Sequence, residues 1–135
     1  MRIQLGFLFI VIMFLSCNKD REDRIPDVYV YYHTTHIEFN QNKENEVLLV
    51  NNNGVAGLII YRRPDNSYVA YDRCSSVNPQ QKCTVIPDDF GPTATDPCSG
   101  AKFFLLDGSP AKAPAKRPLK EYQVIITNFT LTVRN

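Results

Sequence analysis

Short runs of β-branched and aromatic residues, separated by polar turn residues, occupy most of the chain after Pro26. Runs of this length and composition are typical of β-strands. No segment combines a sustained helical spacing of apolar residues with capping residues, and the chain contains no internal repeat. The pattern predicts an all-β domain over residues 26–135. The expected strands cover residues 28–32, 37–39, 47–50, 58–61, 68–71, 122–126 and 131–133.

Three polar segments predict tight turns between these strands. They are residues 51–54 (Asn-Asn-Asn-Gly), 64–66 (Pro-Asp-Asn) and 127–128 (Thr-Asn). Such residues tolerate the backbone conformations that turns require, so the runs around residues 64–66 read as a hairpin. Residues 73–99 are different, because they form a long, turn-rich insertion that holds every cysteine downstream of Cys17.

The first residues have the pattern of an export signal. An apolar run from Leu5 to Leu15 follows Arg2 and ends at Ser16-Cys17. The run of about ten residues is short for a membrane span of about 20 and is typical of a signal-peptide core. A small residue directly before a cysteine is the pattern of a bacterial lipobox, which predicts a signal peptide at residues 1–16 and acylation of Cys17. An ordinary signal peptide, with Cys17 as a bystander, is the alternative. Acyl chains would hold the protein on a bilayer surface without spanning it.

A charged segment separates this leader from the predicted strands. Residues 18–24 contain six charged side chains among seven and no apolar one. Because such a segment has nothing to bury, we expect a flexible tether at residues 17–25. Acidic residues after a lipidated cysteine also resemble the surface-export signals of Bacteroidetes lipoproteins. A solvated spacer is the alternative.

Charge and cysteine content limit which compartment and which partners we expect for this protein. The whole chain has a net charge of +1, and removal of residues 1–16 takes away Arg2 and leaves 14 basic and 14 acidic residues. A near-zero charge provides no long-range attraction for nucleic acid, and an exported protein does not meet it. With Cys17 acylated, three cysteines remain, which allows one disulfide and one thiol in an oxidising compartment.

Residues 96–103 carry the most specific motif, Asp-Pro-Cys-Ser-Gly-Ala-Lys-Phe. The segment resembles the second ligand box of Rieske proteins, which reads Cys-Pro-Cys-His-Gly-Ser-x-Phe, in register throughout. Pro97, Cys98, Gly100 and Phe103 agree with the box. The resemblance implies a Rieske-like antiparallel β-sandwich with a small inserted loop subdomain, and the family's cofactor would be a 2Fe-2S cluster.

The similarity extends over about residues 57–133. Residues 71–76 lie where Rieske domains place the first ligand box, after a hairpin strand. Residues 103–110 match the family's next strand and tight turn, and residues 113–115 (Ala-Pro-Ala) resemble the Gly-Pro-Ala loop that lies over the cluster. The whole chain resembles most the lipoprotein branch of this superfamily in Bacteroidetes.

The resemblance also implies which positions would hold the cluster. A Rieske cluster needs two thiolates and two imidazoles. The four equivalent positions are occupied by Cys74, Ser76, Asp96 and Ser99. Only Cys74 matches a ligand, because Ser76 and Ser99 replace the histidines and Asp96 replaces the second cysteine. Hydroxyl and carboxylate groups are poor ligands for an iron-sulfide core, so we expect no 2Fe-2S cluster and no metal at these positions.

Cys83 and Cys98 match the two non-ligand cysteines that form a disulfide between the ligand loops in many Rieske domains. The resemblance therefore implies a bond between Cys83 and Cys98 that would link the loops without iron. The sequence alone leaves a bond between Cys74 and Cys98 open.

The sequence gives little support for other kinds of metal or catalytic site. His33 and His36 are the two histidines of the chain, and they have no acidic or cysteine partner at metal-ligand spacing. No nucleophile elbow or phosphate-binding loop is present, and no cysteine neighbours a histidine. We therefore expect no enzymatic activity.

The sequence thus predicts a lipid-anchored cell-envelope protein, on the periplasmic or surface face of the outer membrane, whose domain works as a binding or structural module. Its expected partners are the membrane and an envelope protein. An electron-transfer protein with a non-standard 2Fe-2S cluster held by Cys74, Cys83 or Cys98 and Asp96 is the alternative. A redox-sensing thiol at Cys74 is a third hypothesis.

Overall fold

The computed structural model describes residues 24–135. The predicted signal peptide (1–16), the acylation site Cys17 and the tether up to residue 23 lie outside the described residues. Within the described part, no helix is both long and apolar enough to cross a membrane.

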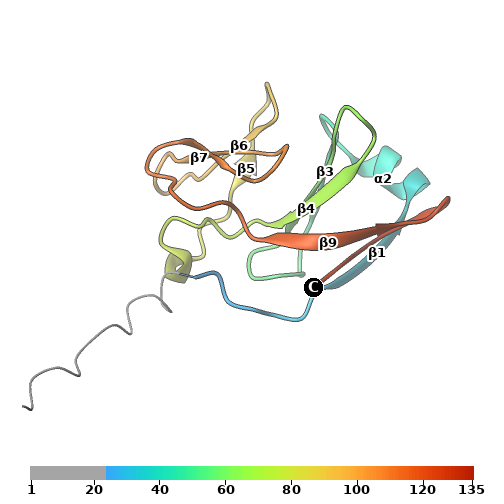
Figure 1. Cartoon of the computed structure of the whole chain (residues 1–135), viewed down its shortest axis with the longest axis horizontal. Helices are drawn as coiled ribbons and strands as arrows, with labels where there is room; N and C mark the ends of the chain where they lie inside the picture. The colour runs from blue at the N-terminus through green and yellow to red at the C-terminus, as the bar shows by residue number, and fades with distance from the viewer. Residues whose placement is uncertain (1–23) are drawn as a thin grey trace, which may run out of the picture.

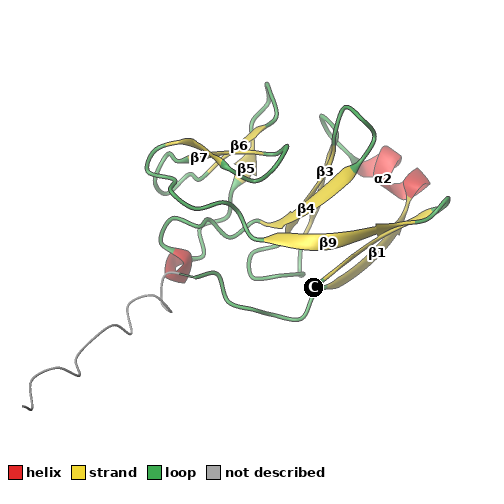
Figure 2. Ribbon diagram, in the orientation of Figure 1, coloured by secondary structure: helices red, strands yellow, loops and turns green. Residues whose placement is uncertain are grey.

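The larger part of the fold is a six-stranded antiparallel sheet (Figure 1). Its strand order is β1-β10-β9-β4-β3-β2, so the first strand pairs with the last. The strands are β1 (Tyr31–Thr35), β2 (Val47–Val50), β3 (Leu58–Arg62), β4 (Tyr68–Asp72), β9 (Glu121–Ile126) and β10 (Thr130–Arg134). Figure 2 shows that the chain between β4 and β9 forms a separate, loop-rich lobe.

This lobe holds a smaller sheet of order β5-β6-β7-β8, also antiparallel. Its strands are short: β5 (Ile86–Pro87), β6 (Thr93–Thr95), β7 (Lys102–Phe104) and β8 (Pro110–Lys112). A short 3-10 helix, η1 (Pro79–Gln81), precedes β5. The lobe is the inserted loop subdomain that the resemblance implies.

Two cores lie on opposite sides of β3 and β4. Because side chains of a strand alternate in direction, Ile59 and Tyr61 of β3 join one core, which includes Phe103 and Leu105 of the smaller lobe. Leu58 and Ile60 join the other core with residues of β10 and the helix that follows β1. β3 is therefore buried on both faces, which explains its continuous apolar run.

The smaller sheet is held by polar contacts around Asp88. The carboxylate accepts hydrogen bonds from the hydroxyls of Thr93 and Thr95 at 2.6 Å each. It also pairs with the ammonium of Lys102 at 2.7 Å. Burial raises the pKa of Asp88, but the bonds from Lys102, Thr93 and Thr95 outweigh burial and bring the pKa below its ordinary value. The side chain that directly follows β5 is thus bonded to β6 and β7.

The all-β class is confirmed, and one predicted element is wrong. Residues 37–39, expected to be a strand, belong to the helix α2 (His36–Asn42). Thr35 caps the helix by accepting from the amide of Glu38, whose carboxylate accepts in return from the amide of Thr35. This capping box satisfies the free amides of the first turn, while Phe39 is buried in the core. The first strand also begins at Tyr31, three residues later than expected.

Candidate functional site at the cysteine loops

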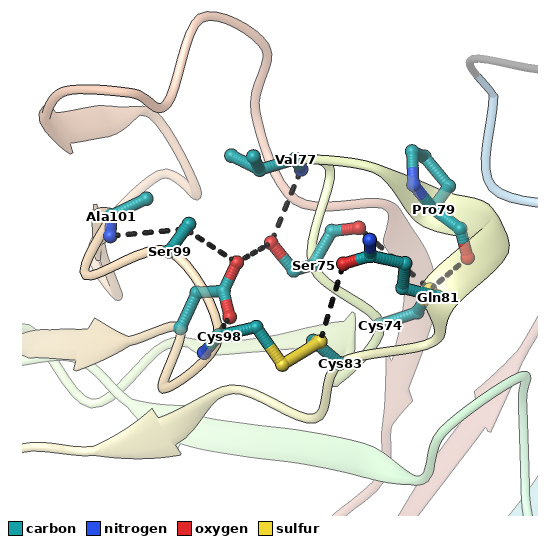
Figure 3. The surroundings of a disulfide bond; sticks show 10 residues. Cys74, Ser75, Val77, Pro79, Gln81, Cys83, Cys98, Ser99 and Ala101 are labelled. Carbon is teal, nitrogen blue, oxygen red and sulfur yellow. Dashed lines mark hydrogen bonds between the residues drawn. A yellow bond between two sulfur atoms is a disulfide. The ribbon is translucent and has the colours of Figure 1, made fainter.

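Two loops form the site, and a disulfide joins them. The first loop follows β4 and carries Cys74 and Cys83, and the second connects β6 to β7 and carries Cys98. The bond joins Cys83 to Cys98, with their Cα atoms 6.2 Å apart, while Cys74 is a free, buried thiol (Figure 3). The structure therefore has the pairing that the resemblance implies, and not the alternative between Cys74 and Cys98.

Asp96 lies at the centre of the site and is fully buried. Its Oδ2 accepts hydrogen bonds from the hydroxyls of Ser75 and Ser99, both at 2.7 Å. Its Oδ1 accepts from the backbone amide of Cys98 at 2.8 Å. A buried carboxylate is costly unless such donors compensate for its lost hydration, so the three bonds account for its presence in the interior.

The two serines are oriented by their own loops. The hydroxyl of Ser75 accepts from the amide of Val77 at 3.1 Å, and that of Ser99 accepts from the amide of Ala101 at 3.2 Å. Each hydroxyl therefore accepts one hydrogen bond from its own loop and donates one to Asp96. Figure 3 shows Ser75 and Ser99 meeting from the two loops, beside the disulfide.

Ser75 is the member of this network that sequence reasoning missed. The resemblance assigns the position of the first histidine to Ser76, but the Ser76 hydroxyl donates to the carbonyl of Arg117, at 2.7 Å. Ser75 and Ser76 are adjacent and chemically identical, so no sequence signal distinguishes them. The backbone of the first loop decides which one faces Asp96.

A second buried carboxylate, Asp72, anchors the first loop. It accepts from the amides of Val55 at 2.6 Å, Ala56 at 3.1 Å and Cys74 at 2.8 Å. It also accepts from the hydroxyl of Tyr122, at 2.8 Å. These bonds connect the end of β4 to the turn after β2 and to β9. The loop that carries Cys74 therefore starts from a rigid point.

Gly54 makes room for this carboxylate. Its φ of +68° is in the left-handed region, and a Cβ at this position would collide with the Asp72 carboxylate. Glycine meets both demands, because it has no side chain and adopts positive φ readily.

Cys74 is packed inside the first loop, and its thiol contacts backbone carbonyls of that loop. It is fully buried, and its Sγ lies 3.6 Å from the carbonyl oxygen of Pro79 and 3.8 Å from that of Ser75. Burial raises the pKa of the Cys74 thiol to about 11, with a further contribution from Asp72. A neutral, enclosed thiol is a poor nucleophile and a poor metal ligand. This environment argues against the redox-sensing role considered for Cys74.

The four family ligand positions do not form a Rieske donor set. Asp96 and Ser99 are bonded to each other, whereas Cys74 and Ser76 make their contacts elsewhere. Both histidines lie outside the two loops and make other contacts. His33, on β1, has its Nδ1 2.9 Å from the hydroxyl of Thr132. His36, the first residue of α2, has its Nε2 2.9 Å from the carbonyl of Thr127. With one thiol, two hydroxyls, one carboxylate and no imidazole, these residues do not fit a 2Fe-2S cluster.

A cavity of about 670 Å³ lies beside the first loop, at Ser76. Residues 24–27 form one wall and residues 117–120 form the other. The ammonium of Lys120 connects the walls by pairing with Asp27 and with the carbonyl of Pro26. The cavity therefore adjoins the position of the family's first histidine without containing the disulfide or Asp96.

Comparison with known proteins finds similarity at the level of structure. The cyanobacterial plasma membrane Rieske protein PetC3 from Synechocystis PCC 6803 aligns with a TM-score of 0.61 and 20% identity, over 81% of this chain and 100% of that chain. A complex of reduced oxygenase and oxidised ferredoxin in carbazole 1,9a-dioxygenase aligns with a TM-score of 0.54 and 20% identity. The alignment covers 78% of this chain and 93% of that chain. The ferredoxin of carbazole 1,9a-dioxygenase from Nocardioides aromaticivorans IC177 aligns with a TM-score of 0.52 and 18% identity. The alignment covers 78% of this chain and 94% of that chain.

No family model and no curated protein sequence matches the chain. The structural similarities show that the domain is Rieske-like, an antiparallel β-sandwich with an inserted lobe, as the second box predicts. At such low identity they show the fold alone, because one fold hosts many functions.

Proposed function

We propose that this Rieske-like protein is a lipid-anchored component of the cell envelope whose domain acts as a binding or structural module without a 2Fe-2S cluster. The observation that carries the proposal is the environment of Asp96. At the position of the second cysteine ligand, the protein has a buried carboxylate whose donors are its own serines. The polar network joins the two loops at the place where the family uses the shared cluster.

The disulfide supports the same conclusion. Cys83 and Cys98 covalently link the two loops, so the site does not need a metal to hold them together. The cavity at Ser76 provides a place where a binding module could receive a small ligand or a segment of an envelope protein partner.

Iron and sulfide analysis of the anaerobically purified full chain tests the absence of a cluster. We expect a colourless protein with neither iron nor acid-labile sulfide, even after incubation with ferrous iron and sulfide. The matched control is the triple variant Ser76→His, Asp96→Cys and Ser99→His, which with Cys74 restores the family's four ligand types. Two irons and two sulfides per wild-type chain, with visible bands that bleach on reduction with dithionite, would contradict the proposal and favour the electron-transfer alternative.

The lipid anchor is tested separately. Arg2, the apolar run and Ser16-Cys17 motivate the expectation that Cys17→Ala gives an unprocessed precursor. Cys74→Ala is the matched control and should be processed normally. Normal cleavage of the Cys17→Ala protein, together with unchanged partitioning into detergent, would count against acylation.

A further inference from the structure

We propose that reduction of the disulfide between Cys83 and Cys98 creates a binding site for a zinc-like divalent cation, with the two thiolates and Asp96 as ligands. The Sγ atoms of these cysteines and a carboxylate oxygen of Asp96 all lie within 4.8 Å of one another. Across residues 24–135, this is the one group of three such side chains with ligand atoms this close. The site uses the non-ligand cysteines of the Rieske pattern and does not use Cys74.

The spacing suits a tetrahedral cation. Zinc binds thiolate sulfur at about 2.3 Å and carboxylate oxygen at about 2.0–2.2 Å, which places neighbouring ligand atoms roughly 3.5–3.8 Å apart. Once the sulfur-sulfur bond is broken, the two sulfurs must separate, and the oxygen has to move inward by no more than about 1 Å. Rotation of short side chains on fixed loops can make both adjustments.

Asp96 has a free coordination position and is held in place. An ionised carboxylate offers about four lone-pair sites, and Ser75, Ser99 and the amide of Cys98 occupy three of them. The fourth site remains for a cation. Hydrogen bonds of this kind orient ligating carboxylates in metal sites, and their loss typically lowers affinity by about 10–100-fold.

The first loop, which carries Cys83, also offers a fourth ligand. The side-chain oxygen of Gln81 lies 4.0 Å from the Sγ of Cys83, and a water molecule is the other candidate for this position. Either would complete four-coordination, and a bound water would leave the cation with an exchangeable site.

The disulfide controls the site, because only thiolates bind the cation. Cys98 is exposed, so a dithiol can reach the bond. In the exchange, the dithiol loses two electrons and two protons and becomes a disulfide, while Cys83 and Cys98 become thiols. The cation then displaces the two thiol protons to solvent and forms two metal-sulfur bonds.

Cobalt titration of the reduced protein tests the proposal. The full chain carrying Cys17→Ala is purified in detergent, so that no thiol outside the described residues can bind metal. It is reduced with a dithiol, freed of the dithiol without oxygen, and titrated with Co²⁺. We expect one Co²⁺ per chain with thiolate-to-cobalt charge-transfer absorption, two thiols protected from alkylation, and displacement by Zn²⁺. The oxidised protein should show none of these signals.

Three variants identify the ligands. Asp96→Asn removes a ligand and should weaken metal binding at least tenfold. Ser99→Ala removes a hydrogen bond that orients the Asp96 carboxylate and should weaken metal binding about tenfold. Cys74→Ser should bind as tightly as the parent protein. Any one of three results would overturn the proposal. They are equal cobalt affinity in the oxidised protein, unchanged cobalt affinity in Asp96→Asn, and loss of the charge-transfer absorption in Cys74→Ser.

X-ray absorption of the zinc-loaded parent protein keeps the test decisive if Asp96→Asn does not fold. Two sulfur ligands with oxygen neighbours support the proposed site, and any other number of sulfurs overturns it. The outcome is independent of the iron analysis, since a colourless protein can either bind or not bind zinc after reduction.

Discussion

At the scale of single residues, two buried carboxylates organise the loops of the site. Asp72 and Asp96 are both inaccessible to solvent, and each has donors on both oxygens. A hydrogen bond to a charged group typically contributes about 1.5–3 kcal/mol, and a donor that loses its partner in the interior costs about as much. Substitutions at these two positions should therefore act through stability.

Asp96→Ala should lower the free energy of unfolding by about 3 kcal/mol, because Ser75, Ser99 and the amide of Cys98 lose their acceptor. Asp107→Ala is the matched control. The exposed Asp107 accepts similar bonds from the amide and hydroxyl of Ser109, so its removal should destabilise the protein much less than the removal of Asp96 does. Urea denaturation of the oxidised proteins measures both losses of stability, and equal losses would show that burial of Asp96 does not matter.

Cys74 should resist alkylation in the native protein. Its burial and the raised pKa of about 11 keep the thiol protonated and enclosed near neutral pH. Peptide mapping after treatment with iodoacetamide should find Cys74 unmodified in buffer and modified in denaturant. Cys83 and Cys98 should react only after reduction. Rapid labelling of native Cys74 would revive the redox-sensing hypothesis.

At the scale of elements, local sequence signals and packing each decide different features. The apolar residues Ile37 and Phe39 alternate as in a strand, yet the segment is helical because Thr35 and Glu38 form a capping box. The spacing of Thr35 and Glu38 was a readable helix signal in the sequence. The smaller sheet shows the opposite situation, because its short strands depend on polar contacts that no periodicity reveals.

Acid should weaken the smaller sheet through Asp88. Its pKa in the folded protein lies below the ordinary value, so it contributes stability above a pH of about 4, and the contribution is lost as pH falls through the folded-state pKa. Asp88→Asn should be less stable than the parent at neutral pH and should lose less stability on acidification from pH 7 to about pH 3. Urea denaturation across this range measures the effect, with the exposed neighbour Asp89→Asn as control. Parallel pH profiles for the parent and Asp88→Asn would refute the prediction.

At the scale of the whole molecule, the larger sheet carries two cores and the inserted lobe closes one of them. Tyr71 of β4 packs in the same core as Phe103 and Leu105, and its hydroxyl donates to the carbonyl of Leu105 at 3.2 Å. Gly108 allows this contact, because a Cβ there would lie 2.7 Å from the Tyr71 ring. The lobe is therefore part of the domain's core, and the disulfide connects two of its loops.

Reduction of the disulfide should lower the melting temperature by roughly 10 °C when a chelator is present. The bond closes a loop with a sequence separation of 15 residues, which is worth about 3 kcal/mol in the chain-entropy model. The double variant Cys83→Ser with Cys98→Ser should melt at the lower temperature and should not respond to reductant. Calorimetry compares these proteins, and an unchanged melting temperature after reduction would mean that the bond does not stabilise the domain.

The amino-acid pattern alone was enough to predict the all-β class and the position of the insertion. The resemblance to Rieske proteins implied the Rieske-like fold and a bond between Cys83 and Cys98, and the structure has this bond rather than the alternative with Cys74. The all-β class and the insertion follow from short apolar runs and turn residues, which are local properties of the chain. Three features required the folded structure: Ser75 donates to Asp96, Asp72 accepts from the amides of Val55 and Ala56, and the Cys74 thiol contacts the carbonyl of Pro79. Partners of a buried polar group come from distant segments, and their direction depends on loop backbone and packing, which no local pattern specifies.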